Sequence, residues 1–344
     1  MAPPAMMMFC TSLGMGTVLA TSSYHWLIAW IGLEINTLSI LPLMTKKPHP
    51  RAIEAATKYF LTQAAASALM LFSCLTNALQ VGEWNIDTPA NAANTPLSIA
   101  LMMKLGLAPL HFWLPEVLQG ISLSTGLILS TWQKIPPMTL LFQISYDINL
   151  NLVVILSIAS ILIGGWGGIG QTQLRKIMAF SSIGHLGWII LVLKFSPQLS
   201  LFSFTLYIIM TTAMFLSLIT LSSTKMSQVA TSWTKNPAMT ATTMLILLSL
   251  AGLPPLTGFL PKMLITLELI KQNMIIFATL AMLASLLALF FYLRLTYIIT
   301  LTLPPNTHSS LTTWRTATKP YLTSSIINTL ALILLPLAPT IYFM

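Results

Sequence analysis

The sequence predicts an all-α, polytopic membrane protein of about eleven transmembrane helices, built as an inverted repeat with two broken helices. Three observations lead to this fold class: an apolar composition, apolar runs of span length, and a Pro/Gly motif that occurs twice. Of the 344 residues, 56% are hydrophobic and 7% are charged, and the mean hydropathy is +0.83. A soluble domain carries about 25% charged residues. This chain therefore cannot cover a water-facing surface, and we expect its solvent to be lipid.

Apolar runs of about 20 residues, the length that a helix needs to cross a bilayer, recur along the whole chain. Hydropathy and turn signals give the limits of each helix. We expect helices at 3–22, 25–45, 53–80, 96–122, 124–146, 150–170, 174–194, 198–222, 238–270, 274–301 and 323–343.

Basic and acidic loop residues fall on opposite sides of the membrane. Loops on the side of the N-terminus carry Lys46, Lys47, Arg51, Arg175, Lys176, Lys225, Lys235, Arg315 and Lys319. Loops on the opposite side carry Glu83, Asp87 and Asp147, with Lys194 and Lys271 as their bases. The positive-inside rule then places the N-terminus in the cytoplasm or matrix. An odd number of spans places the C-terminus on the other side.

The repeated motif reads GLAPLHFWLPE at 106–116 and GLPPLTGFLPK at 252–262. Its copies lie in the fourth and ninth expected helices, where Gly and Pro free backbone groups that only protein or a wet cavity can satisfy. An odd helix offset gives the copies opposite directions, as in inverted-repeat transporters. Two unrelated proline kinks are the alternative. We expect a single membrane domain over 1–344, with repeat halves at 1–146 and 150–301 and a C-terminal helix at 323–343.

Ionisable side chains fall inside the expected spans, where a charge costs at least about 2.5–3.5 kcal/mol at the bilayer centre. They are Glu34, Lys104, His111, Lys134, His185 and Lys262. Most have a structural alternative: Lys104 could extend to the interface, Glu34 could only pair with a lysine, His111 could cap the break, and His185 could be a hydrogen-bonded core residue. Lys134 is too deep to reach the interface easily.

Lysines and a glutamate at this depth predict a proton path. Burial disfavours the charged form of either group, and a nearby opposite charge favours it. A change in the distance between Glu34 and Lys104 would therefore move a proton, without a redox centre in the chain. Nearer the interface we expect a surface pair of Glu54 and Lys58, Glu116 at the end of the fourth helix, and Arg294 extended toward the N-terminal side.

Several functional classes are excluded. GWGGIG at 165–170 matches a dinucleotide-binding pattern, but it follows a membrane span and lacks the acidic partner, so close helix packing is the better interpretation. The net charge is +9, but the Lys and Arg residues are scattered singly between apolar runs. This distribution argues against a nucleic-acid partner. Cys10 and Cys74 have no metal or redox spacing. We expect no cofactor and no metal in this chain.

Four blocks carry a family resemblance: KLGLAPLHFWLPEV at 104–117, TWQKIPP at 131–137, GGWGGIGQTQLRKIMAFSSIGHLGW at 164–188 and LAGLPPLTGFLPK at 250–262. With these blocks the chain resembles the subunit 2 family of NADH:ubiquinone oxidoreductase, respiratory complex I, in its shortened animal mitochondrial form. The resemblance implies an antiporter-like subunit of the membrane arm, related to subunits of sodium/proton antiporters. Eleven helices fit a form that lacks the first three of the fourteen helices in bacterial relatives.

The resemblance also implies site residues, while the order of proton movement stays open. Lys134 would be the central relay and Lys262 the group of the second half-channel. Glu34 would lie in the glutamate-bearing helix and Lys104 in the first broken helix, with His111 and His185 on the hydrophilic axis.

The resemblance implies a subunit of the proton-translocating NADH:ubiquinone reductase of the mitochondrial inner membrane, with its N-terminus in the matrix and its C-terminus in the intermembrane space. FMN, iron–sulfur clusters and ubiquinone are expected in other subunits. Expected partners are antiporter-like subunit 4, the small subunits 4L and 6, accessory subunits, and phospholipids including cardiolipin. A subunit of a cation/proton antiporter is the alternative. A purely structural scaffold would leave Lys134 unexplained.

Overall fold

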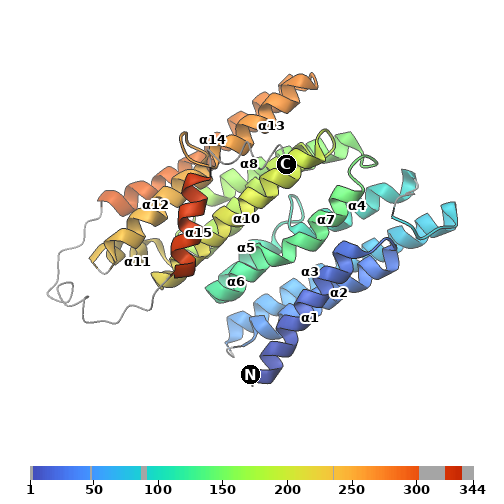
Figure 1. The fold of residues 1–344 in the computed structure, drawn as a ribbon, viewed down its shortest axis with the longest axis horizontal. Helices are drawn as coiled ribbons and strands as arrows, with labels where there is room; N and C mark the ends of the chain where they lie inside the picture. The colour runs from blue at the N-terminus through green and yellow to red at the C-terminus, as the bar shows by residue number, and fades with distance from the viewer. Residues whose placement is uncertain (1–2, 47–48, 87–90, 235, 302–321, 335–344) are drawn as a thin grey trace. The chain divides into compact units, whose positions relative to one another are not determined.

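A computed structural model describes residues 3–46, 49–86, 91–234, 236–301 and 322–334 (Figure 1). Within these ranges the chain forms α-helices, two short 3-10 turns and connecting loops, with two isolated bridge pairs and no strand. The all-α prediction is confirmed. Lys47, Asp87, Lys235, Arg315, Lys319 and the second half of the expected helix 323–343 lie outside the described residues.

The chain divides into two compact units, Met1–Ser160 and Ile161–Met344. In unit 1 the helices pack in neighbouring pairs, α1 on α2, α2 on α3, and α3 on both α4 and α5. The elements of unit 1 are α1 (Pro3–Ser22), α2 (Trp26–Met44), α3 (Pro50–Val81), α4 (Asn91–Leu105), α5 (Trp113–Gly120), α6 (Leu123–Ser130), η1 (Trp132–Lys134), α7 (Ile135–Gln143) and the first half of α8 (Leu150–Ile169).

In unit 2, α10 packs against both α12 and the C-terminal helix α15, and α14 packs against α12 and α13. After the second half of α8, its elements are α9 (Leu174–Leu191), α10 (Pro197–Thr220), α11 (Met226–Thr231), η2 (Ser232–Thr234), α12 (Pro237–Ala251), α13 (Phe259–Lys271), α14 (Ile275–Leu301) and α15 (Leu322–Ile333). The short helix α11 was not predicted, because six residues are too few to show a hydrophobic period.

Six of the described helices are long and apolar enough to cross a membrane: α1, α2, α3, α8, α10 and α14. Two shorter apolar helices, α12 and α15, accompany them. The expected spans at 96–122 and 238–270 are each divided into two helices, α4 with α5 and α12 with α13. Both predicted breaks are therefore confirmed.

The two breaks have the same backbone geometry at the same offset. Gly106 and Gly252 directly follow α4 and α12, and each has a φ of +82°. Glycine adopts this left-handed conformation without the strain of a Cβ atom. Ala108–Pro109 and Pro254–Pro255 are both cis. The motif therefore specifies one local structure twice.

A second local feature is repeated. In unit 1 the Trp26 amide donates to the Trp84 carbonyl at 3.0 Å, and the Ile86 amide donates to the Tyr24 carbonyl at 3.2 Å. In unit 2 the corresponding bonds are Leu174 to Thr224 at 3.1 Å and Met226 to Thr172 at 3.3 Å. Each pair of bonds ties the start of a unit's second helix to the loop that follows its third helix.

The structure differs from the prediction over 124–146, where one continuous span was expected. It is divided into α6, the 3-10 turn η1 and α7, with Lys134 as the last residue of the turn. Pro136 and Pro137 follow after Ile135 and have no N–H, so the carbonyls four residues before them lose their helical donors. The Ile135 amide donates to the Trp132 carbonyl instead, which closes a 3-10 turn.

Glycines set the closest helix contacts. A Cβ atom on Gly32 of α2 would lie 2.7 Å from the Ala20 nitrogen and 2.9 Å from the Gly16 oxygen of α1. In unit 2 a Cβ atom on Gly164 of α8 would lie 2.7 Å from the Gly184 nitrogen of α9. Within the stretch 165–170, a Cβ atom on Gly165 would lie 2.7 Å from the Leu287 Cβ atom of α14, so its expected role in close helix packing is confirmed.

We predict that Gly32→Leu separates α1 from α2, because the new side chain has no space between the two backbones. Overpacking of this kind destabilises a protein by about 1–3 kcal/mol. The yield and thermal stability of detergent-solubilised protein measure the effect. Gly14→Leu is the control, because a Cβ atom there meets nothing within 4 Å. Equal losses from both substitutions would contradict the packing role of Gly32.

Candidate functional site

Unit 1 holds a small cavity of about 20 Å³. A volume of this size accommodates one or two water molecules. Its walls come from α2, α3, α4, α5 and the η1 region, and are formed by Leu33, Thr37, Tyr59, Gln63, Lys104, Trp113, Leu129, Gln133, Lys134 and Pro137. Two of the predicted lysines therefore face one cavity.

Both lysines are buried, with 7% of Lys104 and 3% of Lys134 exposed. Lys104 lies in the last turn of α4, directly before the break. Its Nζ atom is buried and has no hydrogen-bond partner among the described residues. An unpaired buried ammonium is costly, so the polar walls of the cavity and any water within it are its available partners.

Glu34 lies in the middle of α2 and is half-buried. Its Oε2 atom is buried and has no hydrogen-bond partner in the described part of the chain. The carboxylate is near enough to Lys104 and to Tyr59 for its charge to act on both. Leu33 and Thr37 of the same helix line the cavity. The proposed control of the Lys104 proton by Glu34 stays a prediction.

His111 lies inside the first break and is 4% exposed. Its carbonyl accepts a hydrogen bond from the Leu114 amide at 3.0 Å, and its ring contacts the Phe112 ring at a centroid distance of 4.4 Å. Within the described residues it does not line the cavity that holds Lys104. Its Nδ1 atom is buried and has no hydrogen-bond partner among the described residues, so its expected place on the hydrophilic axis stays a prediction.

Sequence reasoning missed the polar and aromatic residues of the cavity wall. Tyr59 is 2% exposed and packs edge-on against Trp113, with ring centroids 5.7 Å apart. Gln63 is 4% exposed on the same helix. A search for polar side chains on the buried face of α3 would have found Gln63, because it follows Tyr59 by one helical turn.

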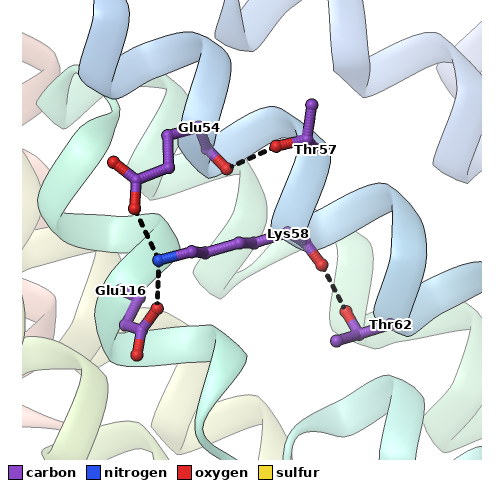
Figure 2. Close-up of polar contacts among 5 residues, drawn as sticks. All are labelled: Glu54, Thr57, Lys58, Thr62 and Glu116. Carbon is purple, nitrogen blue, oxygen red and sulfur yellow. Dashed lines mark hydrogen bonds and ion pairs between the residues drawn. The ribbon is translucent and has the colours of Figure 1, made fainter.

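A charged cluster outside the cavity joins α3 to α5 (Figure 2). The Lys58 ammonium lies 2.6 Å from Glu54 Oε1 and 2.6 Å from Glu116 Oε2. The expected pair of Glu54 and Lys58 is confirmed, but its extension to Glu116 was not predicted. Glu116 does not end its helix, since α5 continues to Gly120. The cluster fixes the half-helix that carries Trp113.

Unit 2 has its own cavity of about 20 Å³ at the second break. The predicted residues His185 and Lys262 both line it. Leu250 also lines this cavity. It lies 146 residues after Lys104, the same offset that separates the two copies of the motif, so the two residues occupy equivalent positions. Lys262 correspondingly holds the position of Glu116. Each cavity therefore has one lysine from its broken helix, placed before the break in unit 1 and after it in unit 2.

Short contacts fix the second break. The Lys262 Nζ atom donates to the Ala251 carbonyl at 2.7 Å. Thr257, in the loop of the break, donates to the Ala331 carbonyl of α15 at 2.5 Å. A Cβ atom on Gly258 would lie 1.7 Å from the Ser249 oxygen, so only glycine fits there. The break is thus held by a lysine, a hydroxyl and a close backbone contact.

Hydroxyl groups near His185 were also missed from the sequence. Tyr292 and Ser181 line the cavity together. The Tyr207 ring lies 5.9 Å from the His185 ring. Both tyrosines are 1% exposed. Isolated tyrosines in apolar helices give no periodic signal, so the sequence could not separate them from ordinary core residues.

Two other expectations concern charge and metals. The Arg294 guanidinium donates to the Ile169 carbonyl at the end of α8, and its expected extension toward the N-terminal side stays a prediction. Among the described residues, no group of three or more His, Cys, Asp or Glu side chains is placed to hold a metal ion.

The motifs and the two broken helices match a known family. The family model described as "NADH:quinone oxidoreductase/Mrp antiporter, TM" matches residues 23–288. The chain belongs to the NADH:quinone oxidoreductase/Mrp antiporter family. A second family model, "NADH dehydrogenase subunit 2 C-terminus", matches residues 289–342.

Curated relatives in this family have nearly the same length. The chain is 71% identical over 341 residues to the NADH-ubiquinone oxidoreductase chain 2 of Aquarana catesbeiana, covering 99% of each chain. It is 59% identical to the Xenopus laevis protein of the same name, covering 98% of this chain and 99% of that one.

Solved structures share the fold of this family. A chain of respiratory complex I from Thermus thermophilus aligns with a TM-score of 0.82 at 24% identity, covering 96% of this chain and 79% of that one. A chain of the Mrp complex from Dietzia aligns with a TM-score of 0.79 at 19% identity, covering 96% and 76%.

We predict that Glu116→Lys weakens the contact between α3 and α5, because it places a second cation beside Lys58. The double variant Lys58→Glu with Glu116→Lys restores opposite charges and recovers part of the loss. The thermal inactivation midpoint at low and high salt measures this, since salt screens exposed charge pairs. Additive losses in the double variant would show that the two residues do not interact.

We predict that Gly258→Ala displaces the second break, because its methyl group would overlap the Ser249 carbonyl. The expected cost is about 3 kcal/mol or more, at the upper end of overpacking effects. Thermal stability of the solubilised protein measures it. Gly170→Ala is the matched control, since a Cβ atom at Gly170 meets nothing within 4 Å. Wild-type stability of Gly258→Ala would contradict the close contact.

Proposed function

We propose that this chain is a core membrane-arm subunit of respiratory complex I that moves protons across the inner mitochondrial membrane. NADH oxidation and ubiquinone reduction take place in other subunits and supply the energy. The observation that carries the proposal is the pair of buried lysines, Lys104 and Lys134, facing one water-sized cavity in a chain of this family.

The proposed proton transfer follows from the cost of a charged side chain inside the membrane. A buried ammonium is stable only while a neighbouring carboxylate or water compensates it. When Glu34 compensates Lys104, Lys104 holds its proton; when that compensation weakens, the proton passes to Lys134 through water in the cavity. Lys134 acts as the central relay, and Lys262 with His185 forms the half-channel of unit 2. His111 contributes to the relay only if water reaches it from the cavity.

The proposal also covers the orientation of the chain in the membrane and its partner subunits. The N-terminus faces the matrix and the C-terminus the intermembrane space, and the two halves, 1–146 and 150–301, run in opposite directions through the bilayer. FMN, iron–sulfur clusters and ubiquinone are held by other subunits. The partners are antiporter-like subunit 4, the small subunits 4L and 6, accessory subunits, and phospholipids including cardiolipin.

A subunit of a cation/proton antiporter is the second candidate, favoured by the fold shared with the Dietzia Mrp chain. The two candidates differ in assembly. A complex I subunit migrates in mild detergent with an assembly many times larger than 37.7 kDa that oxidises NADH. An antiporter subunit migrates without that activity, and this result would replace the first proposal.

We predict that Lys134→Ala leaves the complex assembled but lowers the number of protons pumped per NADH oxidised. The alanine removes the central proton carrier and relieves the cost of a buried charge, so assembly should persist. Proton uptake and NADH oxidation in sealed vesicles give the ratio. Lys271→Ala is the control, because that side chain is 73% exposed. An unchanged ratio and turnover in Lys134→Ala would rule out Lys134 as a relay.

A further inference from the structure

The Gln133 side chain connects two segments that carry ionisable groups. Its Nε2 atom donates a hydrogen bond to the Asn36 carbonyl at 3.0 Å. Asn36 lies in α2, two residues after Glu34, and Gln133 lies in η1, directly before Lys134. One hydrogen bond therefore joins the helix of Glu34 to the turn of Lys134.

The backbone around Gln133 is held by few hydrogen bonds of its own. Pro136 and Pro137 cannot donate to the carbonyls of Trp132 and Gln133, as residues at their positions would in a regular helix. A 3-10 turn inside a longer helix often marks a hinge. Side-chain contacts to other helices therefore have a large share in fixing where the turn lies.

The same hydrogen bond lies at the wall of the unit 1 cavity. Gln133 and Lys134 line the cavity from η1, and Leu33 and Thr37 line it from α2 on either side of Glu34. Lys104 lines it from α4. A shift of η1 away from α2 would change the separation between Lys134 and the other two charged groups.

We propose that Gln133 is a positioning residue, which holds Lys134 at a set distance from the helix of Glu34 and so tunes proton exchange between Lys134 and Lys104. The inference rests on the proposed function. Its physical basis is that the interaction between two charges falls with their separation and is strong where water is scarce. A displaced Lys134 would exchange protons with Lys104 less readily, although the fold would be intact.

The test uses the assembled complex with Gln133→Leu, which removes the donor and keeps a side chain of similar size. We expect normal assembly and a roughly 2- to 10-fold slower proton uptake at equal NADH oxidation, the factor that follows from losing one hydrogen bond. Gln143→Leu is the matched control, because Gln143 is exposed at the end of α7. The double variant Gln133→Leu with Lys134→Ala should equal Lys134→Ala alone.

The outcomes separate this inference from the proposed function. Wild-type proton uptake in Gln133→Leu, with impaired uptake in Lys134→Ala, overturns the role of Gln133 and leaves the relay intact. Wild-type uptake in both variants overturns the proposed function as well. A further loss in the double variant beyond Lys134→Ala overturns positioning through Lys134. If Gln133→Leu does not assemble, Gln133→Met is measured, and failure of both identifies a purely structural role.

Discussion

The structure depends on the requirement that backbone and charge removed from water be satisfied within the protein. A membrane helix satisfies its own backbone, whereas a broken one leaves carbonyls and amides at depth. Here each break carries a left-handed glycine, and in the second break the Lys262 side chain supplies a donor for the last carbonyl of α12. The breaks in turn bring lysines to small cavities, so the fold and the candidate chemistry have one origin.

In the first unit, three kinds of contact hold the helices around the cavity. Glycine contacts seat α2 against α1, the cluster around Lys58 seats α5 on α3, and the bond from Gln133 seats η1 against α2. None of these contacts carries a proton in the proposed mechanism. They fix the helices that present Glu34, Lys104 and Lys134, and a relay needs such fixed distances because proton transfer falls off steeply with separation.

The sequence predicted the helices, both breaks and the deep lysines, because apolar length, Pro/Gly motifs and charges in lipid are strong local signals. It did not predict the turn at Lys134, although Pro136 and Pro137 lie in the middle of the expected span 124–146, because membrane helices tolerate proline within a span. Tyr59, Gln63 and Gln133 were missed for a different reason. Their place in a cavity wall depends on which helices pack together, and no local pattern encodes that packing.

Lys104 lies before the first break and Lys262 lies after the second, and this difference has an electrostatic consequence. The C-terminal end of a helix carries a partial negative charge. Lys104 lies in the last turn of α4, and Lys262, although it belongs to α13, donates to the final carbonyl of α12. Two different places in the motif thus put a lysine residue at the C-terminal end of a helix or in contact with it. A helix end therefore precedes each break, and the lysine that lies nearest it comes from before the break in unit 1 and from after the break in unit 2.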